Sequence, residues 1–202
     1  ISGVITDSGK FKWDTEKYPG MKDFKKFGPF AYTAKLRNGL FRNTGACLSP
    51  QNAFYNSIGM ETLGLRMERV CDNAKTLAQF FATEYSDIEV NYPGLAGSKW
   101  HNIATEQFGD KFGGIITIRT GNKKRAFGII DALKLPLIVS NIGDTKTLVI
   151  HPESTLNVHS TQEEKETAGV FDDLIRISVG IEDIDDLIDD FKQAIESVKD
   201  VY

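Results

Sequence analysis

Apolar positions recur at helical spacing in two adjacent parts of the 202-residue chain. Ser49 and Pro50 form a strong helix start, because serine caps helices well and proline fits the first helical position. Gly59 and Gly64 weaken this helix, so we expect a break between them. A second helix is predicted from about 65 to 84. Its expected buried stripe consists of Met67, Val70, Ala74, Leu77, Ala78 and Phe81.

Strand and helix patterns alternate after residue 87. Alternation of this kind is typical of an α/β architecture, a sheet with helices on one or both faces. Thr161 and Glu164 have the spacing of a capping box at a helix start. The predicted strands cover 88–92, 114–120, 137–139, 148–150 and 174–179, and the predicted helices cover 98–108, 122–133, 161–168 and 183–198.

The first 48 residues show weaker patterns. The first half of residues 1–11 predicts a strand, and no partner strand follows it closely in the sequence. This is typical of a strand cut from a larger sheet, although an ordinary edge strand gives the same pattern. Residues 12–48 are irregular and rich in aromatic residues, with a short helix predicted at 30–38. Most of these aromatic side chains are expected to pack over a core rather than to line a pocket.

Composition indicates an ordinary globular protein, with 41% hydrophobic residues, 26% charged residues and a net charge of −4. Basic clusters are small and no apolar run is long enough to span a bilayer, so neither nucleic acid nor membrane is an expected partner. Cys47 and Cys71 form no CxxC pair, and each is expected to be a small buried hydrophobe in a reducing cytoplasm. Ile1 is not a start methionine, so we expect a piece of a longer protein.

Arg176 interrupts an apolar run that predicts a buried strand. Arginine is rarely buried without a partner, and its fork of N–H donors suits a planar carboxylate. One interpretation is a clamp for the carboxylate of a substrate, and the other is a structural salt bridge to a nearby acid. Physics alone favours the salt bridge. Gly180 ends the strand, and Asp183 stands where a helix N-cap is expected.

A second candidate lies in residues 140–148. Asn141, Gly143 and Asp144 follow a predicted strand, at a junction where backbone donors and a side-chain amide can bind an anion. An Asx-type turn explains the same residues and is preferred from the residues alone.

Other chemistry is weakly indicated. His151 and His159 have no third metal ligand at useful spacing, and His101 is expected to be structural. The glycines of 109–114 have the wrong spacing for a nucleotide cradle. Lys10 and Lys146 lie nearest to the informative segments, but an exposed lysine is a poor nucleophile.

Several of these segments resemble the cystathionine synthase/lyase family, the pyridoxal-phosphate enzymes of Cys and Met metabolism. The likeness covers essentially the whole chain and is carried by 173–183, by 45–54 with its continuation 61–69, and by 7–11. It implies that Arg176 grips the α-carboxylate of the amino-acid substrate and that Asn141 lies beside it. Asparagine followed by glycine and aspartate at 141–144 is typical of the O-acetylhomoserine sulfhydrylase branch.

The segment that begins at His151 also resembles a family segment. Leu156 and Asn157 replace the usual threonine and histidine there, so the role of these two positions stays open.

The resemblance implies an α/β fold, the end of the large domain of a fold-type I pyridoxal-phosphate transferase followed by the complete small domain. The implied boundaries are 1–58 for the remnant of the cofactor domain, 59–84 for a connecting long helix and 85–202 for the small domain. The implied reaction forms homocysteine or methionine from O-acetylhomoserine and sulfide or a thiol. The family's Schiff-base lysine lies upstream of Ile1, so we expect no catalytic residue, no covalently bound cofactor and no activity in this chain alone.

Expected partners are an amino-acid substrate, the missing N-terminal cofactor domain and further copies in a cytoplasmic homo-oligomer, a tetramer for the full-length family. Two alternatives stay open. One is another family member, such as a cystathionine γ-synthase or methionine γ-lyase, against which the 141–144 string argues moderately. The other is a non-catalytic α/β module that binds a small carboxylate or a partner protein.

Overall fold

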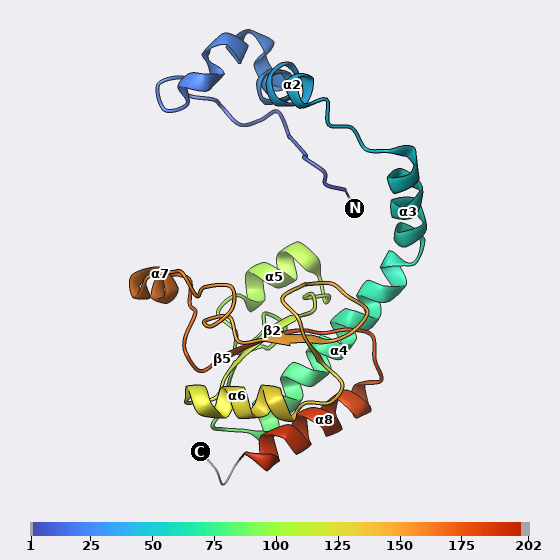
Figure 1. Ribbon diagram of the computed structural model, residues 1–202, viewed down its shortest axis with the longest axis vertical. Helices are drawn as coiled ribbons and strands as arrows, with labels where there is room; N and C mark the ends of the chain where they lie inside the picture. Colours follow the sequence, from blue (N-terminus) through green and yellow to red (C-terminus); the bar gives the residue numbers. More distant parts are fainter. Residues whose placement is uncertain (1, 199–202) are drawn as a thin grey trace. The chain divides into compact units, whose positions relative to one another are not determined.

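The computed structural model describes residues 2–198 (Figure 1). The chain divides into two compact units, one ending at Thr62 and the other beginning at Leu63. Each unit is described by itself.

The first unit is helical. The strand expected at its beginning is not formed: residues 2–8 have no regular secondary structure, and no described segment of this unit offers them a strand edge. Residues 12–48 are more helical than predicted, and the helix expected at 30–38 is divided between an α-helix and a π-helical turn. The elements are η1 (Pro19–Phe30, 3-10), α1 (Ala31–Leu36), η2 (Arg37–Phe41, π), α2 (Arg42–Thr44) and α3 (Pro50–Glu61).

Aromatic side chains of this unit pack on one another. The ring of Trp13 stacks on that of Tyr32, with centroids 5.5 Å apart, and meets Phe11 edge-on at 4.7 Å. These rings therefore pack on one another, whereas the sequence predicted packing over a core. Among the described residues of the unit, however, only Met21 and Ala31 are buried apolar side chains, so its core is small.

The predicted start and break of α3 are confirmed. The hydroxyl of Ser49 accepts a hydrogen bond from the N–H of Asn52 at 3.1 Å, which satisfies one of the free donors of the first turn. The helix ends at Glu61, and α4 begins at Leu63. Cys47, just before this helix, is exposed, so its expected burial is wrong.

The second unit is a five-stranded sheet with helices, and the predicted alternation is confirmed. Its largest boundary shift is at α5, which begins three residues later than predicted because 94–100 form turns. None of its described helices is both long and apolar enough to cross a bilayer. The elements are α4 (Leu63–Glu84), β1 (Glu89–Asn91), α5 (His101–Phe108), β2 (Ile115–Arg119), α6 (Lys123–Ala132), β3 (Leu137–Ile138), β4 (Leu148–Ile150), α7 (Gln162–Thr167), β5 (Leu174–Ser178) and α8 (Ile184–Ser197).

The strand order is β1-β2-β5-β4-β3, and every pair is antiparallel except β3 with β4. The strand β5 that carries Arg176 is therefore central. Arg176 stands opposite Thr117 on β2 and opposite Ile150 on β4. Because side chains alternate along a strand, Arg176 and Ser178 lie on one face of the sheet and Ile175 and Ile177 on the other.

Helices α4, α6 and α8 cover the face of Ile175 and Ile177. Figure 1 shows α6 and α8 on one side of β2 and β5, and α5 on the other. The core on this side includes Ala74, Leu77, Phe81, Ile116, Ile118, Ile129, Ile175, Ile177, Leu187, Phe191 and Ile195, all fully buried. Burial of so many large apolar side chains is the main source of stability of this unit. It also leaves the opposite face free to carry polar side chains.

The predicted stripe of α4 is buried from Val70 onwards, but Met67 is 41% exposed, so its assignment to the core is wrong. The helix meets the sheet first at Val70, whose side chain lies so close to Gly114 that a Cβ there would collide with it. Met67 lies about one turn before this contact. Cys71 is buried, as predicted.

The predicted caps at both late helices are confirmed. Asp183 accepts a hydrogen bond from the N–H of Asp185 at 3.0 Å at the start of α8. Thr161 and Glu164 form the reciprocal capping box of α7, at 2.8 and 3.3 Å.

Candidate functional site

Arg176 is held by backbone carbonyls and by no carboxylate. Its Nη2 donates to the carbonyl oxygens of Ser140 at 2.8 Å and Asn141 at 3.3 Å. Its Nε is buried without a hydrogen-bond partner. Within residues 2–198, no aspartate or glutamate comes within ion-pair distance of the guanidinium. The structural salt bridge that physics alone favoured is therefore not formed by the described residues.

The Arg176 guanidinium is a partly desolvated cation. Burial lowers the pKa of Arg176, because loss of water disfavours the charged form. Arginine nevertheless stays charged in proteins, so the fold carries the cost of this desolvation, and the part of the chain that the structure describes supplies no compensating anion. Its Nη1 makes no hydrogen bond to the described residues and is not sealed from solvent, so two N–H donors are available to a ligand.

Residues 139–147, between β3 and β4, form a connection that we call the carbonyl loop. It brings Asn141 to Arg176 through the backbone oxygen of Asn141, which is an exposed residue. The proposed role of the Asn141 side chain beside a substrate carboxylate stays a prediction. Asp144 accepts a hydrogen bond from the N–H of Lys146 at 3.1 Å, and this bond lowers the pKa of Asp144. The Asx-type turn is thus present in the same loop that supplies two backbone carbonyls to Arg176.

Sequence reasoning missed three polar residues of the site. Ser140 supplies the shorter of the two carbonyl contacts to Arg176. Thr117 stands opposite Arg176 on β2 and accepts a hydrogen bond from Asn91 at 3.2 Å. Ser178 shares the face of Arg176 and accepts from the N–H of Gly143 at 3.2 Å. Strand alternation could have identified Thr117 and Ser178, since each interrupts an isoleucine-rich strand.

His151 and His101 make structural contacts. The buried His151 ring has Nε2 at 2.7 Å from the carbonyl oxygen of Asp172 and Nδ1 at 2.9 Å from the hydroxyl of Ser154. Nδ1 of His101 is 2.9 Å from the carbonyl oxygen of Pro93. His159 is exposed. Across residues 2–198 no three His, Cys, Asp or Glu side chains gather as a metal site.

Glu153, in the same segment as His151, lies between two lysines. Its carboxylate oxygens are 2.8 Å from Nζ of Lys123 and 2.5 Å from Nζ of Lys165. These hydrogen bonds lower the pKa of Glu153 to about 2, from an ordinary 4.5. The ionised carboxylate therefore contributes stability that is fully present above the ordinary value and is lost as the pH falls through about 2.

We expect Glu153→Gln to lower the free energy of unfolding at neutral pH by about 1 kcal/mol, since solvent screens both ion pairs. The difference from the unchanged chain should shrink as the pH falls from about 5 to about 2. Urea unfolding at a series of pH values measures it, with Glu163→Gln as the control that removes an exposed charge from the neighbouring α7. A difference that stayed constant with pH would contradict the assignment.

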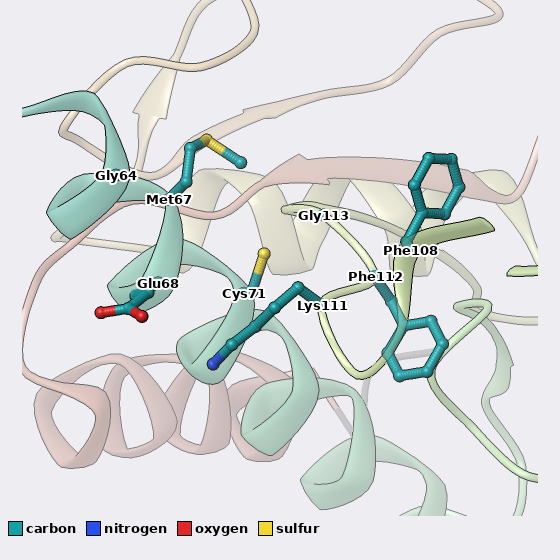
Figure 2. A pocket seen from close by; sticks show the side chains of 8 residues that line it. All are labelled: Gly64, Met67, Glu68, Cys71, Phe108, Lys111, Phe112 and Gly113. Carbon is teal, nitrogen blue, oxygen red and sulfur yellow. The ribbon is translucent and has the colours of Figure 1, made fainter. Parts of the chain in front are cut away.

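Two cavities border α4. The smaller, about 180 Å3, lies against the carbonyl loop and is lined by Ile142, Gly143, Thr145 and Ser178 among others. The larger, about 340 Å3, is mostly apolar, and Figure 2 shows Met67 and Cys71 from α4 with Phe108 and Phe112 around it. Lys111 at its edge is 2.8 Å from Asp72, and this hydrogen bond raises the pKa of the lysine. The larger cavity therefore offers no free nucleophile from Lys111.

The closely packed glycines of the second unit, Gly94, Gly114 and Gly180, form no phosphate cradle. Where glycines approach other groups closely, protein atoms fill the space: the ring of Tyr92 at Gly94, Val70 at Gly114 and the 145–146 backbone at Gly180. None of these glycines leaves room for a phosphate. Lys10 and Lys146 are exposed, so neither amine is desolvated as a cofactor-attaching lysine would need to be.

Known proteins match nearly the whole of this chain. The homocysteine synthase of Schizosaccharomyces pombe is 39% identical over 209 residues, which are 97% of this chain and 49% of that protein. The O-acetyl-L-homoserine sulfhydrylase of Corynebacterium glutamicum is 37% identical over 215 residues, 98% of this chain and 49% of that protein. The chain thus spans about half the length of these relatives.

A solved structure shares the fold. It is described as an O-acetylhomoserine (thiol)-lyase of Campylobacter jejuni with N'-pyridoxyl-lysine-5'-monophosphate. Its TM-score is 0.76 at 39% sequence identity, and the match covers 82% of this chain and 39% of that one. The Cys/Met metabolism PLP-dependent enzyme family matches residues 1–196, nearly the whole sequence. The family match covers nearly the whole chain, and a solved relative shares its α/β fold. The chain therefore belongs to the Cys/Met metabolism PLP-dependent enzymes.

Proposed function

We propose that this chain is the C-terminal part of a pyridoxal-phosphate-dependent O-acetylhomoserine sulfhydrylase, and that it binds the α-carboxylate of the amino-acid substrate. The observation that carries the proposal is the Arg176 guanidinium, which is partly buried and has no carboxylate partner within residues 2–198. A substrate carboxylate would supply the missing anion at the free Nη1. The names of the relatives supply the substrate class.

In the proposed reaction, sulfide or a thiol replaces the acetoxy group of O-acetylhomoserine, so that homocysteine or methionine and acetate are formed. Bound pyridoxal phosphate would supply the electron sink for this chemistry. The residues of this chain orient the substrate: Arg176 binds one end of it, and the side-chain amide of Asn141 is proposed to donate to the same carboxylate. A fixed carboxylate limits the positions that the rest of the substrate can take.

The groups that hold the cofactor, including its lysine, are proposed to lie in a large domain of which 1–58 is the end. Residues 59–84 would connect it to a small domain of 85–202. We propose a cytoplasmic homo-oligomer, a tetramer, with a role in methionine biosynthesis.

The test compares the 202-residue chain with a protein that carries it behind its upstream cofactor domain. The longer protein is expected to convert O-acetylhomoserine and sulfide to homocysteine in the presence of pyridoxal phosphate, and the chain alone is expected to form none. Product is measured by mass spectrometry. Homocysteine formation by the chain alone, or turnover by the longer protein of a γ-lyase substrate but not of O-acetylhomoserine, would contradict the proposal.

A further inference from the structure

The position of Arg176 depends on a loop that it does not belong to. Among the described residues only two groups bind the guanidinium, the carbonyl oxygens of Ser140 and Asn141, and both bind the same nitrogen. The Nε of Arg176 is buried and has no hydrogen-bond partner among the described residues, so it does not help to fix the guanidinium. Any shift of the carbonyl loop therefore shifts the guanidinium or breaks both of its hydrogen bonds.

The carbonyl loop is in turn anchored to the turn that follows β5. We call residues 179–183 the glycine turn. Gly143 donates to Ser178 at the end of β5 at 3.2 Å, and the N–H of Ile181 donates to the carbonyl oxygen of Thr145 at 2.9 Å. A Cβ at Gly180 would collide with the Thr145 carbonyl, so the two segments are in direct backbone contact.

Thr147 and Glu182 form the strongest anchor. Both carboxylate oxygens of Glu182 are used, one by the N–H of Thr147 at 2.5 Å and the other by its hydroxyl at 2.8 Å. The same hydroxyl accepts from the N–H of Gly180 at 2.9 Å. Thr147 is fully buried, and hydrogen bonds to an ionised acceptor are stronger than neutral ones.

Asn73 joins this anchor to the helical layer. Its Nδ2 donates to the carbonyl oxygens of Gly180 at 3.1 Å and Glu182 at 2.9 Å, and the residue is 2% exposed. The glycine turn is thus fixed from α4 on one side and from the end of the carbonyl loop on the other. Asn73 and Thr147 are buried and Glu182 is partly buried. A largely buried polar network whose members are paired holds a single arrangement.

We propose that the network of Asn73, Thr147 and Glu182 positions Arg176 for the substrate carboxylate, and that these three are positioning residues rather than purely structural ones. This inference rests on the proposed function of Arg176 and deepens it. Residues that hold a binding group often matter as much as the group, because a displacement of about 1 Å can cost 100-fold in rate.

The test uses the 202-residue chain labelled with 15N, so that no substrate or cofactor is needed. The Nε–Hε resonance of Arg176, assigned by its disappearance in Arg176→Lys, reports on the guanidinium. Thr147→Val keeps the shape of the side chain and removes the hydroxyl, and Thr147→Ser keeps the hydroxyl. We expect Thr147→Val to shift this resonance and to speed its hydrogen exchange at least about ten-fold, and Thr147→Ser to leave it near its original position.

Asn122→Ala is the control for general loss of stability, since it removes the cap of α6 and touches neither segment. If Thr147→Val fails to fold, Glu182→Gln takes its place. Glutamine has one side-chain oxygen, so it can accept from the Thr147 N–H but then offers no second oxygen to the Thr147 hydroxyl. An Arg176 signal that is unchanged in a folded variant with lowered Tm, or that moves equally in Asn122→Ala, would overturn the proposal. If the proposed carboxylate binding itself is wrong, Arg176→Lys should leave the activity of the longer protein unchanged.

Discussion

Replacement of Arg176 by lysine should lower kcat/KM for O-acetylhomoserine in the longer protein by roughly 30- to 1,000-fold, which corresponds to about 2–4 kcal/mol. Lysine keeps the charge but lacks the planar fork, so it cannot keep the carbonyls of Ser140 and Asn141 on one nitrogen and offer a second nitrogen to the substrate. The main effect should be on KM, because the interaction is made with a part of the substrate that does not react. Steady-state kinetics of homocysteine formation measure it.

Arg119→Lys is the matched control. Arg119 lies on the neighbouring strand β2, but it already has carboxylate partners, Asp173 at 2.9 Å and Glu89 at 3.6 Å, and its guanidinium is 4.0 Å from the Phe171 ring. Its replacement should lower Tm and leave KM nearly unchanged. If Arg176→Ala behaved like Arg119→Lys, lowering Tm without changing kcat/KM, the guanidinium would be a structural group and the carboxylate proposal would be wrong.

The fold of the second unit could be predicted because its local and long-range preferences agree. The isoleucine-rich strands at 115–119 and 174–178 have their partners within the chain, and helices with a clear apolar stripe cover them. At the beginning of the chain, local preference and available partners disagree. Residues 2–8 have strand-like composition, but a strand forms only where a second edge accepts its hydrogen bonds, and propensity carries no information about that.

The candidate site could be predicted only where side chains carry the chemistry. Arg176 is visible in the sequence as a single cation in an apolar run, and its role as a carboxylate ligand stays a prediction. Its actual partners, the carbonyls of Ser140 and Asn141, are backbone atoms that every residue possesses, so no pattern identifies them. The contact between Thr147 and Glu182 was also missed, because the two residues are 35 positions apart in the sequence and no local pattern links them.

The two units should differ greatly in stability. The second unit buries many large apolar side chains in one core, whereas Met21 and Ala31 are the buried apolar residues among those described in the first. A unit of about sixty residues with so little buried apolar surface gains little free energy to offset the loss of chain entropy. We therefore expect slow exchange in β2 and β5, with protection factors of about 10^4 or more, and factors below about 10^2 in residues 2–48.

Exposed apolar side chains add a second expectation for the first unit. Val4, Phe30, Leu40 and Phe54 are each more than 60% exposed, and surface of this kind promotes association in water. Hydrogen exchange followed by mass spectrometry, with sedimentation at several concentrations, tests both expectations on the same sample. Self-association should increase with concentration and should raise protection in residues 2–48 but not in β5. A strictly monomeric chain protected as strongly in residues 2–48 as in β5 would show that the first unit is self-sufficient, and that its exposed apolar side chains need no further surface to cover them.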